Sequence, residues 1–358
     1  MTTIRLAAVG DLLFTTRPGA KAPGRGLEAL SDEIRQLFAD CDLVLANLEC
    51  TLPGGPLVAS EPRVLADESQ LRGLPSAGIH TVTLGNNHAF DAGDAGFHRL
   101  TTLLDETGIA WCGAGRDLAE AEQPLLINVK DLRLALLPAV AGSSGMYRFA
   151  TETSSGVAPL ETDALCRRIT ALRREVDHVI LTPHWGEERF RLPSPIQVEQ
   201  ARAFIEAGAS LVLGHHPHVV QGLEFHRQAP IAYSLGNFLA NEVYWDNGDT
   251  LTWNRFERTG CILLAELDAT GVRNVQQIPV FDDGTTLAID TSGRGERYLE
   301  RANHYLREGI TPLRYRREAF RVRTLLPILG QLRWEKLRRL RPGHLGKAIR
   351  LFLQGLRS

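Results

Sequence analysis

The sequence has no long apolar run. No stretch of about 18 consecutive apolar residues, the length that a helix needs to cross a bilayer, occurs in its 358 residues. The N-terminus also lacks a basic segment, an apolar core and a cleavage site, since Met1-Thr2-Thr3 passes directly into the strand-like run 4–10. We therefore expect neither a transmembrane helix nor a secretory signal, and a cytoplasmic location.

Cysteine is scarce and forms no recognisable pattern. The five cysteines are odd in number and scattered, with no Cys-x-x-Cys pair. This pattern argues against both a disulfide framework and a thiolate zinc site. We expect all of them to be reduced and structural.

Net positive charge is absent from most of the chain. The formal net charge is −2, but residues 331–358 hold eight Lys or Arg against one acid, Glu335. That segment is +7, so the preceding 330 residues carry −9. An acidic body is a poor partner for long nucleic acids, whose affinity comes mainly from phosphate neutralisation. We expect a small or medium anionic substrate and no nucleic-acid partner.

The order of apolar and amphipathic runs predicts an α/β protein. Strands are expected at 4–9, 43–47, 81–84, 126–138 and 178–183, and helices at 27–39, 94–107, 160–174 and 196–207. After residue 208 strands dominate, near 210–213, 230–234, 260–267 and 274–281. This order favours parallel βαβ units first and antiparallel strands later.

Two segments interrupt this alternation. Residues 239–259 form a long excursion rich in aromatic residues, which is either a lid over a site or an ordered surface loop. Residues 296–358 are basic and predict a helical C-terminal extension of a domain formed by residues 1–295. The apolar stripe from Leu345 to Leu356 predicts that this extension either packs on the core or makes a peripheral membrane contact through 331–358.

Polar side chains recur where strands are expected to end. The segments are Gly10-Asp11, Asn47-Leu48-Glu49, Gly85-Asn86-Asn87-His88, His184-Trp185-Gly186 and Gly214-His215-His216-Pro217-His218. Ligand sites in open α/β sheets assemble at the carboxyl ends of strands, so these segments are expected to meet at one rim. Carboxylates, an amide and imidazoles suit divalent ions such as Mn, Fe or Zn.

Each segment taken alone also has a plain structural interpretation. Asp11 could be a helix N-cap, Glu49 a surface charge and His184 a satisfied core histidine. Asn86-Asn87 is equally typical of a turn. Three histidines within residues 215–218 are unusual for a loop with no function. The segments taken together favour a metal site.

The motifs together resemble the CapA family of bacterial capsule or poly-γ-glutamate synthesis proteins, which is related to the calcineurin-like metallophosphoesterases. The matching segments are 9–13, 42–49, 84–93, 113–115, 184–186 with Glu188, 208–218 and 233–238. They cover residues 4 to about 240 in the family's order and spacing. The resemblance implies a four-layer αββα sandwich with two divalent metal ions at the rim of its central sheets.

The resemblance also implies which residues would hold the metals. Asp11 and His218 would bind the first ion, and Glu49 would bridge both. The second ion would be bound by Asn87, His184 and His216. Two departures from ordinary metallophosphoesterases are shared with CapA-like proteins: Asp11-Leu12-Leu13 replaces Asp-x-His, and the bridging residue is Glu rather than Asp.

Other residues would act beside the metals. His88 would face the scissile group, and Asp91 would either fix its tautomer or cap a helix. The resemblance and the strand-end positions suggest substrate-binding or supporting roles for Asn47, Asn86, Glu188, His215, Ser234, Asn237 and Arg63, although Arg63 is equally a surface arginine.

A two-metal centre activates water and holds the attacking and leaving oxygens of a displacement at phosphorus. The first hypothesis is therefore a phosphoesterase with His88 as general acid. A second, from the resemblance, is a role in making or exporting capsule or poly-γ-glutamate. A third is a non-catalytic metal-binding module. Specificity is expected from the loops 52–66, 142–158 and 239–259.

Overall fold

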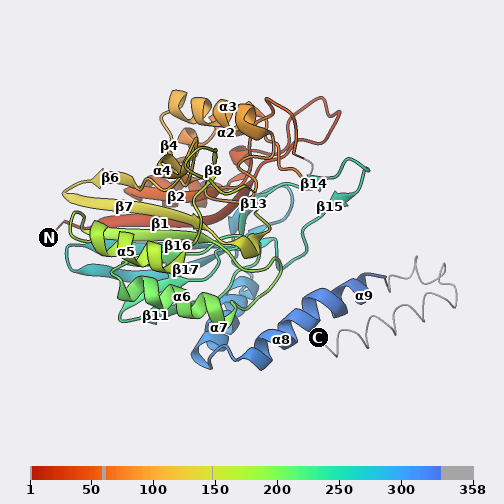
Figure 1. Cartoon of the computed structure of the whole chain (residues 1–358). Coiled ribbons are helices and arrows are strands. Elements are labelled where there is room, and N and C mark those ends of the chain that lie inside the picture. Colours follow the sequence, from red (N-terminus) through yellow and green to blue (C-terminus); the bar gives the residue numbers. More distant parts are fainter. Residues whose placement is uncertain (1, 59–61, 147, 332–358) are drawn as a thin grey trace.

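Two β-sheets lie face to face between layers of helices in the computed structural model, which describes residues 2–58, 62–146 and 148–331 (Figure 1). The larger sheet has the order β18-β17-β16-β1-β2-β3-β4, with β13 beside β1. Its strands are β1 (Ile4–Leu13), β2 (Leu43–Leu48), β3 (Thr81–Thr83), β4 (Ala110–Cys112), β13 (Asn237–Ala240), β16 (Thr259–Asp268), β17 (Gly271–Asp282) and β18 (Leu287–Ile289). Strands β1 to β4 are parallel, whereas β16, β17 and β18 pair antiparallel.

The smaller sheet has the order β11-β12-β10-β9-β7-β6. Its strands are β6 (Leu125–Val129), β7 (Leu132–Val140), β9 (His178–His184), β10 (Leu211–Leu213), β11 (Leu223–His226) and β12 (Ala229–Ala232). The four central strands are parallel and the two edge strands are antiparallel. Two short pairs lie outside both sheets: β5 (Ala114–Gly115) with β8 (Gly156–Val157), and β14 (Val243–Tyr244) with β15 (Thr250–Leu251).

Helices cover the outer faces of both sheets. The α-helices are α1 (Asp32–Ala39), α2 (Glu68–Arg72), α3 (Gly93–Glu106), α4 (Leu118–Ala121), α5 (Thr162–Leu172), α6 (Pro195–Glu206), α7 (Arg294–Arg307), α8 (Pro312–Phe320) and α9 (Leu326–Gln331). Short 3-10 turns are η1 (Leu27–Ala29), η2 (Pro75–Ala77) and η3 (Gly142–Ser144), and a π-helical turn, η4 (Arg321–Leu325), joins α8 to α9. In Figure 1, α2 and α3 lie on the opposite side of the sheets from α5 and α6.

The layers follow from the two-residue period of a strand. In β1, Ala7 and Val9 face the helices, whereas Leu6 and Ala8 face the other sheet. The same alternation in β7 divides its residues between the space separating the sheets and the space beneath α5 and α6. Each sheet thus buries both faces, and the predicted four-layer αββα sandwich is confirmed.

The structure corrects one strand and refines others. The run 126–138, predicted as one strand, is a hairpin of β6 and β7, and Lys130 turns the chain with a φ of 51°. The predicted helix 27–39 is interrupted by Leu30 and Ser31 between η1 and α1. Strand β1 continues four residues past its predicted end, so Asp11 lies within a strand and is not a helix N-cap.

The predicted C-terminal extension begins with helices that are part of the body. Leu299 and Leu306 of α7 are buried in the core clusters of the sheets, and the predicted boundary at 295 stays a prediction. The basic helices predicted within 332–358 lie outside the described residues. No helix in the described ranges is long and apolar enough to cross a membrane.

Strand β1 branches at Asp11, where β13 joins it. The backbone N–H of Asp11 donates to Gly236 O at 2.9 Å, and the pairing of β1 shifts register at this point with both β13 and β2. Gly10 permits this approach, because a Cβ on it would lie 1.8 Å from Gly236 O. At this branch, the side chain of Asp11 lies close to Glu49 and His218.

We predict that Gly10→Ala lowers the free energy of unfolding by about 1–3 kcal/mol, because the added methyl group forces the backbones of β1 and Gly236 apart. Gly142→Ala is the matched control, since a Cβ there meets nothing within 4 Å and should change stability by less than about 0.5 kcal/mol. Urea unfolding of both variants measures the difference. Equal urea midpoints for the two variants would show that the contact between Gly10 and Gly236 does not require glycine at position 10.

Candidate metal centre

The strand ends of both sheets supply the side chains of one buried centre. Asp11 comes from the branch of β1, and Glu49 follows the last residue of β2. His184 is the last residue of β9, and 214–218 is the loop after β10. Asn87 lies between β3 and α3. The rim predicted from the sequence therefore exists, and both sheets contribute to it.

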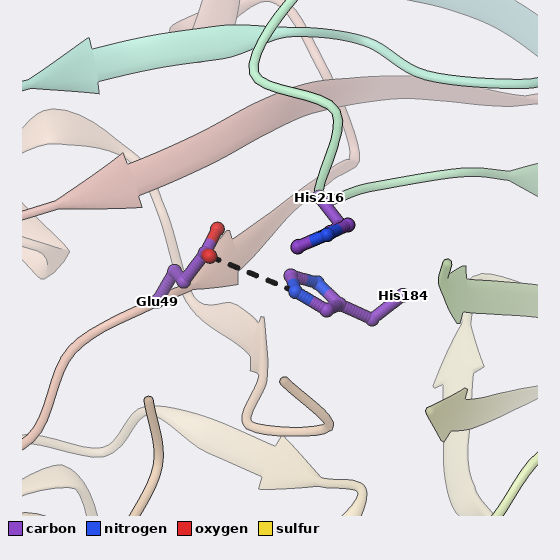
Figure 2. Close-up of side chains that lie close together, drawn as sticks. All are labelled: Glu49, His184 and His216. Atoms are coloured by element: carbon purple, nitrogen blue, oxygen red, sulfur yellow. Dashed lines mark ion pairs between the residues drawn. The ribbon is translucent and has the colours of Figure 1, made fainter. Parts of the chain in front are cut away.

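Two groups of ligand-type atoms converge there. In the first group, Glu49, His184 and His216 offer atoms that all lie within 4.8 Å of one another; Figure 2 shows their side chains pointing toward a common space. In the second, Asp11, Glu49 and His218 meet the same limit. Glu49 belongs to both groups, as the bridging role implied by the resemblance requires.

Asn87 lies beside the first group. Its Oδ1 is 2.8 Å from His184 Nε2, and the same imidazole nitrogen is 3.6 Å from Glu49 Oε1. The amide oxygen and the carboxylate thus face one ring nitrogen from two directions. These contacts bring together the whole ligand set implied for the second metal.

Buried atoms without partners indicate that the first group fits a cation. Glu49 Oε1 and His216 Nδ1 are buried and make no hydrogen bond within the described ranges. Buried polar atoms normally have a partner, and a bound ion is one of the recognised exceptions. Oxygen and imidazole nitrogen are ligands for Zn, Mn and Fe, so the residues present fit a divalent ion.

Their surroundings hold the two buried carboxylates in different charge states. Asp11 and Glu49 are both 0% exposed. Burial would raise the pKa of Asp11, but hydrogen bonds from His215 and His218 hold it well below its ordinary value. Burial and the charge of Asp11 raise the pKa of Glu49 to about 8. A divalent cation bound beside Glu49 would oppose these effects and favour its ionised form.

The imidazoles differ in charge state. Burial and the charge of His216 hold the pKa of His184 well below its ordinary value. Burial and the charge of His218 lower the pKa of His216 to about 4. Both rings are therefore neutral near pH 7, which is the form that binds metals. Burial opposes protonation of His218, but the charge of Glu49 and a hydrogen bond to Asp11 raise its pKa.

The loop that carries two of these imidazoles is held in an unusual conformation. His216 has a φ of 96° and His218 a φ of 56°, in the left-handed region that few residues other than glycine adopt. The backbone N–H of His216 donates to Asp11 Oδ2 at 3.3 Å. This conformation turns both rings toward the carboxylates.

A buried amide links the carboxylates. Asn47 Nδ2 donates to Asp11 Oδ1 at 2.9 Å and to Glu49 Oε2 at 3.4 Å. Its Oδ1 accepts from Thr83 Oγ1 at 3.1 Å and from Asn86 Nδ2 at 3.2 Å. Asn47, itself held from the neighbouring strand β3, thereby fixes the orientation of both carboxylates. Thr83 is a supporting residue that the sequence motifs did not indicate.

His88 and Asp91 form a pair at the edge of the centre. His88 Nδ1 lies 2.7 Å from Asp91 Oδ2, which also accepts from the backbone N–H of Val64 at 2.8 Å. Asp91 thus contacts His88 and does not cap α3. Burial lowers the pKa of His88, but the charge of Asp91 outweighs it and raises the pKa overall.

Three predicted supporting residues lie behind the ligands. His215 Nδ1 is 3.0 Å from Asp11 Oδ1, and His218 Nδ1 is 3.0 Å from Asn237 Oδ1. Ser234 does not reach the centre; its Oγ bonds Val219 O and the N–H of Gly236. Its contribution is to hold the turn that presents Gly236 to β1.

Glu188 lies near the histidines of the centre, whereas Arg63 connects two loops. Glu188 is an exposed residue, four positions after His184. Desolvation would raise the pKa of its carboxyl, but the charges of His218, His216 and His88 lower it, so this carboxylate faces the centre. The Arg63 side chain is 13% exposed, donates from Nε to Val58 O and pairs with Asp246 at 2.7 Å. It therefore connects the loop 52–66 to the excursion 239–259.

The excursion is ordered and contacts the centre. Trp253 is buried, its Nε1 donates to Asn241 O at 2.7 Å, and its ring centroid lies 5.3 Å from that of His218. Glu257 O accepts from Asn237 Nδ2 at 3.2 Å. These contacts could not be predicted from sequence spacing, because no motif connects Trp253 or Glu257 to the histidine loop. The only signal was their position in a long excursion rich in aromatic residues.

The four-layer fold, with carboxylates and imidazoles at the strand ends, defines a protein of the metallophosphoesterase-like superfamily. The chain belongs to the family described as bacterial capsule synthesis protein PGA_cap, whose sequence profile matches residues 5–242. This match confirms the resemblance seen in the motifs. Residues 243–331 of the described chain lie beyond the matched region.

Two relatives carry capsule-related names. The capsule biosynthesis protein CapA of Bacillus anthracis is 32% identical over 193 residues, covering 52% of this chain and 46% of the relative. The PGA biosynthesis protein CapA of Bacillus subtilis (strain 168) is 25% identical, covering 68% of this chain and 64% of the relative. The chain thus spans about half to two thirds of the length of these relatives.

Solved structures resemble the chain more distantly. A hypothetical protein from Thermus thermophilus aligns over 77% of this chain and 98% of its own, with 17% identity and a TM-score of 0.48. The NAD nucleotidase of Haemophilus influenzae aligns over 85% of this chain and 63% of its own, with 15% identity and a TM-score of 0.45.

We predict that His184→Ala and His216→Ala each weaken binding of Mn²⁺ or Zn²⁺ by at least about tenfold, because each removes a nitrogen from the first group. His98→Ala is the control, since His98 is an exposed histidine of α3. Metal titration by calorimetry, with chelator-treated protein, gives the affinities. Equal affinity in all three variants would exclude these two histidines as ligands.

Proposed function

We propose that the chain is a metal-dependent hydrolase of phosphate esters, with His88 as general acid. The observation that carries the proposal is the His88–Asp91 pair beside two ligand groups that share Glu49. A metal site alone needs no such pair. An imidazole held by a carboxylate at the edge of a metal centre is a group that can transfer a proton to a leaving oxygen.

The chain's own residues define how the proton would move. Asp91 bonds Nδ1 of His88, so Nε2 is the nitrogen that remains for a substrate, and it makes no hydrogen bond among the described residues. Two divalent ions, when bound, would supply an activated water and neutralise charge on the phosphoryl oxygens. Nε2–H of His88 would donate to the leaving oxygen. Asp91 would stabilise the imidazolium form before that transfer.

We predict that His88→Ala lowers kcat on nitrophenyl phosphate substrates by about 10²–10⁴-fold while metal affinity stays unchanged, because the general acid is lost and the ligands are kept. Asp91→Asn should reduce kcat less than His88→Ala, since it acts by positioning the ring. Initial rates with Mn²⁺ present, together with metal titration of each variant, measure both effects.

The matched control is again His98→Ala, which should retain the rate of the wild-type protein. Absence of hydrolysis by the wild type on a panel of phosphate monoesters and diesters contradicts the proposal. Hydrolysis that is unchanged in His88→Ala contradicts the role of His88 alone.

A second function is suggested by the names of the relatives. We infer, as an alternative, that the centre acts in the synthesis or export of an anionic polymer such as capsule or poly-γ-glutamate. Two relatives are named for capsule or PGA biosynthesis, and the family-matched region includes every proposed ligand. On this alternative the centre would act on a peptide-like or phosphorylated intermediate.

We predict, for this alternative, that metal-loaded wild type changes the length distribution of poly-γ-glutamate, because the centre acts on the polymer. His216→Ala should leave the distribution unchanged, and His98→Ala should behave as the wild type. Size-exclusion chromatography of the polymer after incubation is the measurement. Unchanged polymer with the wild type, combined with phosphoesterase activity, favours the first function.

A further inference from the structure

A pocket lined by arginines lies outside the region that the family profile matches, apart from Arg191. Its volume is about 320 Å³, and five arginines line it: Arg191, Arg255, Arg294, Arg297 and Arg301. The remaining lining includes the rings of Phe256, Tyr298 and Tyr305. Among the described residues no Asp or Glu lines this pocket.

One wall of the pocket is a face of α7. Arg294, Arg297 and Arg301 are spaced i, i+3 and i+7, so they lie along one side of the helix over about 10 Å. Tyr298 anchors this face, because its hydroxyl donates to Val220 O at 2.9 Å.

The opposite wall holds the other two arginines against an aromatic ring. The guanidinium groups of Arg191 and Arg255 lie 5.4 and 5.1 Å from the centroid of Phe256. The ring of Phe256 packs in turn against Tyr298 at 5.5 Å, which joins the two walls. The aromatic base of the pocket is therefore built from packed side chains, whereas Arg255 and the three arginines of α7 are exposed around it.

Most of this positive charge is not balanced by the protein. Arg191 lies 3.6 Å from Glu318, but Arg255, Arg294, Arg297 and Arg301 make no ion pair and no side-chain hydrogen bond within the described ranges. Asp290, which lines the neighbouring cavity with Arg294, is bonded to the backbone N–H groups of Ser292 and Gly295. Burial would raise the pKa of Asp290, but these hydrogen bonds and the charge of Arg294 lower it, so Arg294 is partly balanced. Arg255, Arg294, Arg297 and Arg301 are exposed, so solvent screens their mutual repulsion, but together they present a row of positive charge that an anion can pair with.

We propose that this pocket binds a short chain that carries several carboxylate or phosphate groups. Arginine binds both groups through paired N–H donors. The length of the α7 row favours negative groups spread along a ligand over a single small anion. The volume is at the lower end of the range for ligand sites, which suits a few linked units. The proposal does not depend on the metal centre.

The test is calorimetric titration of the full chain with hexaglutamate and, separately, with tripolyphosphate. We expect at least one probe to bind, more weakly as salt rises. Arg297→Ala/Arg301→Ala should weaken binding by at least about tenfold, because two charge-assisted contacts are lost. The control, Arg316→Ala/Arg317→Ala, removes two exposed arginines of α8 that do not line the pocket, and should change affinity by less than about twofold.

Several outcomes decide the proposal. Binding of hexaglutamate alone assigns a carboxylate ligand, and binding of tripolyphosphate alone assigns a phosphate ligand. The proposal is contradicted if neither probe binds, or if both double variants lose the same amount of affinity. The same titration of His216→Ala should match the wild type, since the metal centre is separate. A loss of binding in that variant would place the probe at the centre and overturn the proposal. Circular dichroism checks that each variant is folded.

Discussion

The burial of two neighbouring carboxylates is the constraint on which the centre depends. Asp11 lies near the carboxyl end of β1 and Glu49 directly follows the neighbouring strand β2. Each buried carboxylate would be strongly destabilising without donors or a cation. The molecule meets this constraint from both sheets at once. Asn47 donates from within the larger sheet, and imidazoles approach from the smaller one. The two sheets are thus connected at their rim by charge as well as by the apolar layer between them.

The last part of the excursion, residues 253–257, lies between the metal centre and the arginine pocket. Trp253 contacts the ring of His218, and Glu257 holds Asn237, which in turn orients His218. Between them, Arg255 and Phe256 form one wall of the arginine pocket. Residues 253–257 therefore face the metal centre on one side and the pocket on the other. A rearrangement of residues 253–257 would therefore change the surroundings of His218 and one wall of the arginine pocket together.

Features that depend on local sequence were predictable, and those that depend on distant contacts were not. The alternation of apolar residues was enough to predict β2 and most of β9, and the strand-end motifs were enough to predict which side chains meet. The hairpin at Lys130 was missed because two apolar strands joined by a tight turn read as one long run. The branch of β1 depends on the backbone of Gly236, which is far away in the sequence. The arginine pocket likewise joins three segments that lie far apart in the sequence, and only the last of them belongs to the extension that the sequence showed to be basic.

The left-handed conformations of His216 and His218 lower the stability of the fold but position two imidazoles for ligand binding. Such conformations cost of order 1–3 kcal/mol each for residues with a Cβ, and glycine would adopt them without that cost. A chain optimised only for folding would therefore place glycine at both positions and lose two imidazoles. The loop is a point where the protein accepts a less stable backbone in return for directed nitrogen atoms, as functional sites commonly do. Stabilising this fold by substitution would therefore have to leave this loop alone.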